Sequence, residues 1–516
     1  MINADEAIGD FYFSQKGDKH FLVHYEGNDK TLVLPKNYNG GEYQIGAEVF
    51  MGNTIITKVI IPHSVSIIGN KAFANCANLT SVQLAKGIST IGHGAFENCN
   101  LLSSISLPED LKHIGSDAFK GCYNLKNINM PASVMSIGGS AFEGCDNLNK
   151  VYINSIKDWC MIMFENAYAN PLYYAKTLYF ENQIITKLTI PKGTIRIGSN
   201  AFCNLKSVTS VTLPNDIREI KKKAFQNCEK LTSINIPQSV TSIEDYAFSG
   251  CTSLCRVVIE DGSQVLTLGA NSSENEPKSP SSNKDVYGSN TLGKGLFSDC
   301  PLEYVYLGRN LNYNTDSRFG FSPFYKNSSL YSVIIGDEVT KIENHCFSGC
   351  NRFTSITLPI ALTEIGAYAF RDCRNLTRIN IPKNVTKISE CAFSGCNNLK
   401  SIFISSIEAW CRINFSAPNA NPLYYGKYLF LNEDIVTNLI IPSNVTKIGK
   451  WAFYGCKSLA IITIPESVTK IEENAFKGCG NLRHVSIPKK STKLLKLAFG
   501  EEKSIVVNGK EKKYKL

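Results

Sequence analysis

The residues of this sequence that could do chemistry are chiefly its cysteines and histidines, eighteen and seven in number. Thiolates are nucleophiles and metal ligands, and histidine is the usual partner base or co-ligand, so their spacing decides between a reactive and a structural role. Cysteine and asparagine share a position three residues after a phenylalanine, with asparagine at Asn53 and Asn327. Both are small and can hydrogen-bond to the backbone, so we interpret this column as buried, turn-filling side chains with free thiols. The cysteines of the column are Cys76, Cys99, Cys122, Cys145, Cys228, Cys251, Cys300, Cys350, Cys373, Cys396, Cys456 and Cys479.

The histidines do not complete a catalytic or metal site with these cysteines, because they occupy different positions in different repeats. The spacing of a zinc site, a glycine-rich phosphate loop and a nucleophile elbow are all missing from the sequence. Trp159-Cys160 recurs as Trp410-Cys411, but without a histidine nearby we interpret both pairs as core residues. The sequence therefore predicts no catalytic residue, no cofactor and no metal ion, and we expect the protein not to be an enzyme.

The cysteine column belongs to a repeat of 23 residues, which is clearest in Leu79–Cys99. The repeat begins with alternating apolar and polar residues, which indicates a half-buried β-strand. Proline often follows and ends the strand, because it cannot donate to a strand ladder. A second apolar pair, such as Ile88 and Ile91, turns the chain inward, and an Ala-Phe pair then places a ring in the core. Lysine or glutamate can replace the glycine after that pair, as at Lys221 and Glu244, so the backbone there need not have a positive φ.

Repeats of fixed period share one continuous core and stack into a solenoid. We therefore predict an α/β-type repeat solenoid, built mostly of short β-strands, over residues 46–500. Residues 1–45 do not repeat, and aromatic stretches around Gly17-Asp18 indicate a β-hairpin-like N-terminal cap. Residues 501–516 contain the turn signal Asn508-Gly509 and are predicted to form a C-terminal cap hairpin with a basic tail.

Three interruptions break the 23-residue period, at residues 151–191, 262–324 and 402–442. The first and third are related, because Trp159-Cys160 and Trp410-Cys411 are 251 residues apart and the repeat phenylalanines around them have the same offset. The chain therefore contains a second-order duplication.

Net charge and hydropathy bear on three points: a nucleic acid partner, membrane insertion and cellular location. The formal net charge of +9 over 516 residues is mild, so we expect no nucleic acid partner. A run of eighteen apolar residues is missing, so we expect no membrane insertion. The start at Met1 has no charged-then-apolar leader, which leaves an exported and a cytoplasmic location both open. We expect a monomer.

The pattern Leu-x-x-Ile-x-Ile-Pro followed by Val-x-x-Ile-Gly-x-x-Ala-Phe-x-x-Cys, repeated over about residues 46–500, resembles the BspA-like class of leucine-rich repeats. The interruptions with Trp-Cys and Asn-Pro-Leu-Tyr-Tyr also resemble variants of this class. The resemblance implies a curved, right-handed solenoid with a parallel sheet on its concave face. It further implies an extracellular or cell-surface protein, typically bacterial, that binds host proteins, other cells or matrix.

The outward residues of the predicted strands are mostly small and polar, as on any solvated sheet face. The aromatic exceptions are Tyr152 and Phe403, which are mates in the duplication, and Tyr304 and Tyr306 beside the second interruption. Aromatic residues on an exposed face are candidates for binding. The alternative is that the interruptions fold back and cover them.

Basic residues occupy the outward position two residues earlier in several strands, where acids are missing. Lys150, Arg256 and Arg378 are the candidates that we single out. A mildly basic face favours an acidic protein or an anionic glycan, although acidic residues are also simply poor strand formers.

The sequence thus predicts a non-enzymatic recognition or adhesion protein that binds a host, matrix or cell-surface protein through the solenoid surface. One alternative is a glycan-binding surface protein that uses Tyr152, Tyr306 and Phe403 as stacking platforms. The other alternative is an intracellular protein-interaction scaffold.

Overall fold

The computed structural model describes residues 6–269, 296–313, 322–499 and 503–514. It contains two compact units, one made of Met1–Ser233 and Ser242–Ser253 and the other of Ile234–Thr241 and Leu254–Leu516. The predicted interruption at residues 262–324 lies partly outside the described residues. The limits of the three predicted domains stay a prediction.

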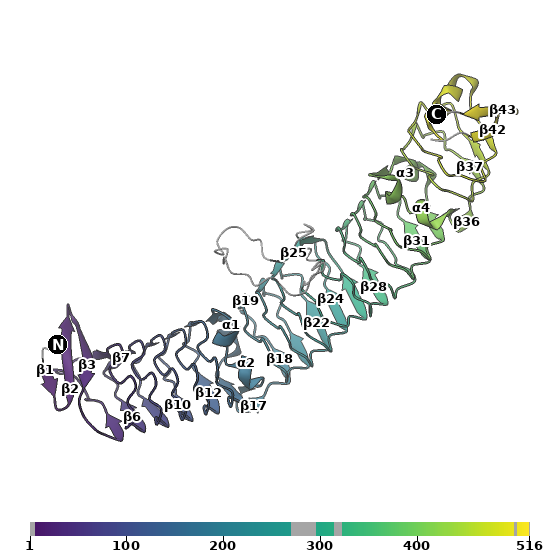
Figure 1. Ribbon diagram of the computed structural model, residues 1–516. Helices are drawn as coiled ribbons and strands as arrows, with labels where there is room; N and C mark the ends of the chain where they lie inside the picture. The colour runs from purple at the N-terminus through teal and green to yellow at the C-terminus, as the bar shows by residue number, and fades with distance from the viewer. Residues whose placement is uncertain (1–5, 270–295, 314–321, 500–502, 515–516) are drawn as a thin grey trace. The chain divides into compact units, whose positions relative to one another are not determined.

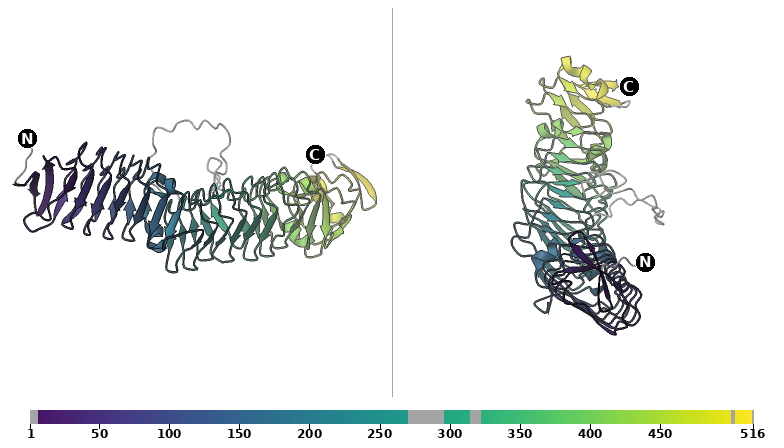
Figure 2. Two further views of the ribbon diagram at one scale, coloured as in Figure 1. Left: turned by 90° about the horizontal axis from the view of Figure 1, so that it is seen from below. Right: turned by 90° about the vertical axis from the view of Figure 1, so that its left-hand side faces the viewer.

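A regular turn of the solenoid contains two parallel strands and a turn segment that carries the phenylalanine. The strands of successive turns can be followed in Figure 1. The strand of the Leu-x-x-Ile-x-Ile pattern, here called the first strand, pairs in register with the first strands of neighbouring turns. Val82 of one turn thus lies between Val59 and Ile105 of its neighbours. A shorter second strand forms a separate parallel sheet, in which Ile91 pairs with Ile114. Strands of successive turns lie side by side in each unit (Figure 2), and the predicted solenoid of short parallel strands is confirmed.

The first strands are β4 (Thr31–Val33), β6 (Lys58–Ile61), β8 (Ser81–Leu84), β10 (Ser104–Ser106), β12 (Asn127–Met130), β14 (Lys150–Ile153), β16 (Leu178–Phe180), β18 (Lys187–Thr189), β20 (Ser210–Thr212), β22 (Ser233–Ile236), β24 (Arg256–Ile259), β26 (Tyr304–Leu307), β28 (Ser332–Ile335), β31 (Arg378–Ile381), β33 (Ser401–Ile404), β35 (Tyr428–Leu431), β37 (Asn438–Ile440), β39 (Ile461–Thr463) and β41 (His484–Ser486). The second strands are β5 (Tyr43–Ile45), β7 (Val65–Ile68), β9 (Thr90–Ile91), β11 (His113–Ile114), β13 (Ser136–Ile137), β15 (Met163–Phe164), β19 (Arg196–Ile197), β21 (Glu219–Ile220), β23 (Ser242–Ile243), β25 (Leu266–Leu268), β27 (Leu311–Tyr313), β29 (Lys341–Ile342), β30 (Glu364–Ile365), β32 (Lys387–Ile388), β34 (Asn414–Phe415), β38 (Lys447–Ile448) and β40 (Lys470–Ile471).

An antiparallel hairpin stands near each end of the chain. β1 (Glu6–Ile8), β2 (Phe11–Lys16) and β3 (Lys19–Tyr25) form antiparallel pairs, and β3 continues into the second-strand sheet through β5. At the other end η3 (Lys489–Leu497) precedes β42 (Lys503–Val507) and β43 (Lys510–Tyr514), which are antiparallel. Tyr25 of β3 packs its ring on Phe50, the first phenylalanine of the column, and β42 pairs with β41. The two hairpins therefore serve as caps, which a solenoid needs at its ends.

The core of each turn is a stacked phenylalanine held next to a cysteine. The rings of Phe73 and Phe96 lie parallel, with centroids 5.4 Å apart. The Cys99 thiol donates to the Phe73 carbonyl oxygen at 3.1 Å, and ten cysteines of the column make this same contact. Asn327 replaces the thiol with an amide that donates to the Cys300 oxygen at 2.8 Å. The predicted buried, turn-filling role is confirmed, and all eighteen cysteines are free thiols.

The glycine after the second apolar pair has no positive φ, but little space is left for a side chain there. A Cβ atom on Gly92 would lie 2.8 Å from the Asn70 nitrogen of the preceding turn, while its φ is not positive. The left-handed positions stand two residues before and two residues after the phenylalanine instead, as at Asp117 and Asn98. The expectation for the glycine position is confirmed.

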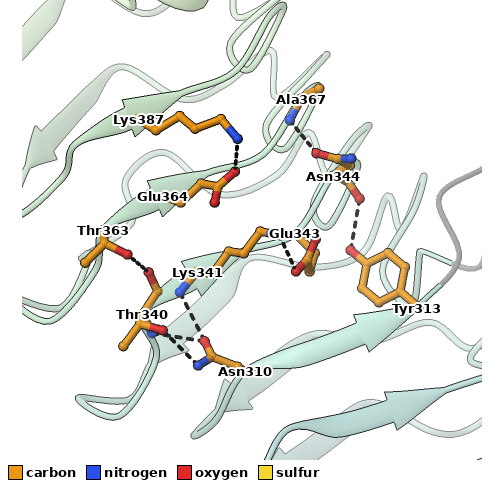
Figure 3. Close-up of polar contacts among 10 residues, drawn as sticks. All are labelled: Asn310, Tyr313, Thr340, Lys341, Glu343, Asn344, Thr363, Glu364, Ala367 and Lys387. Carbon is orange, nitrogen blue, oxygen red and sulfur yellow. Dashed lines mark hydrogen bonds and ion pairs between the residues drawn. The ribbon is translucent and has the colours of Figure 1, made fainter. Parts of the chain in front are cut away.

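Polar ladders join the second strands of neighbouring turns. The amide oxygen of Asn310 accepts from the Thr340 and Lys341 nitrogens, each at 3.0 Å (Figure 3). One turn further on, Lys387 and Glu364 form an ion pair at 2.7 Å. These contacts satisfy backbone groups and charges that would otherwise face neighbouring turns without partners.

The first and third interruptions replace a backbone donor with side chains. In a regular turn the alanine carbonyl accepts from the phenylalanine nitrogen of the preceding turn, as in Phe73 to Ala95 at 2.8 Å. In the first interruption the indole nitrogen of Trp159 and the amide of Asn170 donate to the Ala201 oxygen at 2.8 and 3.1 Å. The two tryptophan-cysteine pairs are buried core residues, as predicted.

The same two interruptions contain the only helices other than η3 among the described residues. The first holds α1 (Ile156–Met161), η1 (Ala167–Ala169) and α2 (Leu172–Ala175), and the third holds α3 (Ile407–Arg412), η2 (Pro418–Ala420) and α4 (Leu423–Gly426). Trp410 and Asn421 of the third interruption donate to the Ala452 oxygen just as their mates do.

Candidate binding faces

The first interruption extends the first-strand sheet. Its strand β16 pairs in parallel with β14, which places Tyr179 directly beside Tyr152. A short strand, β17 (Gln183–Ile184), then turns back antiparallel and places Ile184 beside Tyr179. The two tyrosine rings are half-buried with centroids 5.0 Å apart, and Ile184 is 44% exposed. The inserted strand continues the sheet beside Tyr152, and the Tyr179 ring covers part of Tyr152. That Tyr152 binds a partner stays a prediction.

Lys150 is exposed on the same face. Its ammonium nitrogen lies 5.8 Å from the centroid of the Tyr179 ring, within the range of a cation–π contact. The first interruption therefore presents two tyrosines, an isoleucine and a lysine to solvent.

The third interruption repeats this arrangement with phenylalanine. β35 places Phe430 beside Phe403, and β36 (Asp434–Ile435) places Ile435 beside Phe430. The phenylalanine rings are 4.7 Å apart and nearly parallel. Arg378 is exposed and pairs in register with Ser401, two residues before Phe403.

The outward residues of the two copies differ in polarity, although the inward ones match. Lys150 and Lys187 of the first copy correspond to Ser401 and Asn438 of the second. Thr177, Thr189 and Ser210 correspond to Tyr428, Ile440 and Ile461, which are 43%, 64% and 39% exposed. The first copy folds with polar residues at these positions, so the fold does not require the apolar residues of the second.

A third group lies on β24 and β26. The Arg256 guanidinium stands 4.0 Å from the centroid of the Tyr304 ring. The Tyr306 hydroxyl donates to Asp261 at 2.7 Å, and this hydrogen bond raises the pKa of Tyr306 to about 12. Ile334 pairs with Tyr306 in register and is exposed. Tyr306 is therefore anchored by a carboxylate, whereas Tyr304 is free to present its ring with a cation above it.

The predicted site residues thus fall into three groups. Lys150 and Tyr152 lie on β14 at the first interruption. Arg378 and Phe403 lie on β31 and β33 at the third interruption. Arg256 lies on β24, and Tyr304 and Tyr306 lie on β26. Sequence reasoning did not identify Tyr179 and Phe430. Their signal was a hairpin-like stretch after each Asn-Pro-Leu-Tyr-Tyr motif, but its register with the preceding strand cannot be counted across an irregular insertion.

The buried thiols of the cysteine column are poor nucleophiles at neutral pH. Burial raises the pKa of Cys76 to about 11 and that of Cys145 to about 12, so both are protonated at neutral pH. Within the described part of the chain, His, Cys, Asp and Glu side chains form no group of three or more that could hold a metal ion. The helices described here are all too short and too polar to cross a membrane.

Comparison with known proteins gives one family and a set of solved folds. The model of the "BspA type Leucine rich repeat region" matches residues 43–170, 176–278, 317–412 and 424–508. No curated protein sequence matches the chain. A leucine-rich repeat protein from Bacteroides ovatus is 23% identical over 96% of this chain and 97% of its own, with a TM-score of 0.37. A leucine-rich cell surface protein from Faecalibacterium prausnitzii is 23% identical over 95% and 96%, with a TM-score of 0.27.

The family match covers most of the chain. This chain belongs to the BspA-type leucine-rich repeat family.

Proposed function

We propose that this chain is a non-enzymatic recognition or adhesion protein that binds a protein partner through the first-strand face, beside its third interruption. The observation that carries the proposal is the apolar set Phe403, Phe430, Tyr428, Ile440 and Ile461, whose outward positions are polar or less apolar in the first copy. Exposed aromatic and aliphatic residues gathered on one face are typical of protein interfaces.

The absence of charge among these residues supports a protein partner with an apolar contact patch. The serine and asparagine at positions 401 and 438 replace two lysines of the first copy, so a partner loses little by removing water from this face. The basic residues Lys150 and Lys187 make the first copy better suited to an acidic partner.

The duplication provides the test. We would replace Tyr428, Ile440 and Ile461 with the first-copy residues Thr, Thr and Ser, and measure adhesion to a panel of purified extracellular matrix proteins. We expect at least one interaction of the wild type to weaken about tenfold or more, as for the loss of several interface side chains. The reverse changes Thr189→Ile and Ser210→Ile in the first copy are the control and should leave that interaction unchanged.

Unchanged adhesion of the triple variant to every partner of the wild type would contradict the proposed face.

The cellular location of the protein tests the adhesive role separately. We propose an extracellular or cell-surface location, supported by the family to which the chain belongs, and fractionation of the native cell with detection by antibody would check it. Recovery in the cytoplasm alone would favour the intracellular scaffold.

A further inference from the structure

We propose that a basic, aromatic-walled pocket on the turn segments of the second unit binds a glycan bearing carboxylate or sulfate groups. The pocket has a volume of about 440 Å³, and its lining includes Tyr325, Lys326, His345, Arg371 and Arg374. It lies on the turn segments, away from the strands of the proposed protein-binding face. The inference therefore does not depend on the proposed function.

The hollow arises where a glycine interrupts a column of side chains. The phenylalanines of three successive turns stack with centroids 5.4 and 5.8 Å apart. Two residues after each stands a residue with left-handed backbone: Lys326, Gly349 and Asp372. Gly349 has no side chain, and Lys326 lies close against it. A Cβ atom there would come within 3.0 Å of the Lys326 Cγ atom.

The charges around this space do not balance. Lys326, Arg371 and Arg374 are positive, and Asp372 is the one acidic side chain of the lining. That carboxylate lies 3.3 Å from the Arg371 Nε atom and 4.0 Å from Arg374. Lys326 makes no ion pair with any residue that the structure describes. One carboxylate shared between two guanidinium groups leaves an attraction for a further anion.

In the first copy of the duplication the cation at the position of Arg371 is neutralised by two acids. Lys120, the mate of Arg371, is paired with Asp117 and Glu143 at 3.4 Å each. In the second copy those two acids are replaced by Tyr368 and Ser394. The cation is kept, and its two acidic partners are exchanged for a single one, Asp372, which stands where the first copy has Gly121.

Two more exchanges add positive charge in the second copy. Asn75 and Tyr123 of the first copy become Lys326 and Arg374. Ala74 becomes Tyr325, which adds a ring to the wall. Both copies build the same stacked turns, so these exchanges favour a ligand rather than a folding requirement.

Flat rings form the walls. The His345 imidazole stacks on Tyr368 with centroids 4.8 Å apart and an angle of 6°. Burial and the nearby Arg371 lower the pKa of His345, which disfavours the charged form of this ring. Ser348 and Asn351 add hydroxyl and amide groups to the lining.

A sugar ring matches this combination. Its apolar C–H face stacks on aromatic rings, its hydroxyls hydrogen-bond to serine and asparagine, and a carboxylate or sulfate accepts from the guanidinium fork. The volume lies within the range of small-ligand pockets. An acidic peptide is less suitable, because extended peptides are held along a sheet edge or a long groove.

The test uses the full chain and two probes, a heparin-derived hexasaccharide for sulfate and an oligogalacturonate for carboxylate. We would measure dissociation constants by calorimetry at 0.15 M salt. We expect at least one probe to bind and the variant Lys326→Asn with Arg374→Tyr, which restores first-copy residues, to weaken it about tenfold or more. Binding of the heparin probe alone would assign sulfate, and of the galacturonate alone carboxylate.

Two further variants separate the pocket from general charge. Lys16→Ser with Lys19→Asn also removes two positive charges, from exposed positions of the N-terminal hairpin that belong to no proposed site, and should leave affinity unchanged. Tyr325→Ala restores a first-copy residue without changing charge and should also weaken binding. Thermal melting checks that each variant is folded.

The proposal would be overturned if neither probe binds or if the pocket variants bind as the wild type does. An equal loss in the Lys16/Lys19 control would also overturn it, since the attraction would then come from overall charge. A poly-glutamate peptide would assign the pocket to an acidic peptide instead if it binds the wild type more tightly than both glycans do and binds the pocket variants more weakly.

Discussion

Tyr152 and Tyr179 stand side by side on neighbouring parallel strands, with ring centroids 5.0 Å apart. The first lies on β14, which pairs with the regular strand β12, and the second lies on the inserted strand β16. The pairing shows that the interruption continues the face on which the regular repeats end.

This contact predicts a measurable coupling. Aromatic pairs contribute about 0.5–1.5 kcal/mol beyond the area that they bury, so we expect Tyr152→Ala and Tyr179→Ala to show a coupling of that size in a double-mutant cycle of unfolding free energies. Phe403 and Phe430 provide the matched cycle in the second copy. Strictly additive effects would show that the rings do not pack.

The indole nitrogen of Trp159 donates to the Ala201 oxygen in place of a backbone nitrogen. Trp159→Phe keeps a ring but removes this donor, and we expect a loss of about 1–2 kcal/mol in the free energy of unfolding. Urea unfolding would measure it, with Trp451→Phe as the control. A control loss as large as the Trp159 loss would contradict the role of the hydrogen bond.

Arg309 is fully buried, and its guanidinium donates to the Gln238 and Pro237 oxygens at 2.8 and 2.9 Å. Arg309→Ala leaves both carbonyls without this partner, so we expect a loss of about 2–5 kcal/mol in the free energy of unfolding. Arg378→Ala removes an exposed arginine and should change the same quantity by about 0.5 kcal/mol or less. Urea unfolding of both variants would measure these two losses. Equal midpoints for the two variants would contradict the stabilising role of Arg309.

The thiol column predicts a loss of stability in alkali. Burial raises the pKa of Cys76 to about 11 and of Cys145 to about 12 in the folded chain, whereas an unfolded thiol titrates near about 8.5. Above that pH the unfolded chain binds fewer protons than the folded chain, so the stabilising contribution is full below it and declines as pH rises toward 11–12.

The midpoint of urea unfolding at pH 7, 8.5 and 10 would measure this decline. Cys145→Asn introduces the residue found at Asn53 and should reduce the slope. A slope unaffected by the substitution would show that the thiols do not cause it. Titration of the native chain with a thiol reagent should also be slow, and all eighteen cysteines should react in denaturant.

The regular turns could be predicted because their signals are local. The alternation around Val82, the proline after a strand and the phenylalanine-cysteine spacing each report on a few neighbouring residues, and repetition makes each signal unambiguous. The buried thiols followed from the exchange of cysteine with asparagine at Asn53 and Asn327. Tyr152 and Phe403 could be chosen because they break a polar column.

The amino-acid sequence by itself determined the period, the inward residues and the duplication, because a repeat of 23 places the same side chains in the same core. Only the tertiary structure decided which residues join across the breaks. Tyr179 meets Tyr152 through the hydrogen-bonded register of β14 and β16, and Lys326 lies against Gly349 through the stacking of separate turns. Those contacts depend on distances through space, which residue spacing along an irregular segment does not specify.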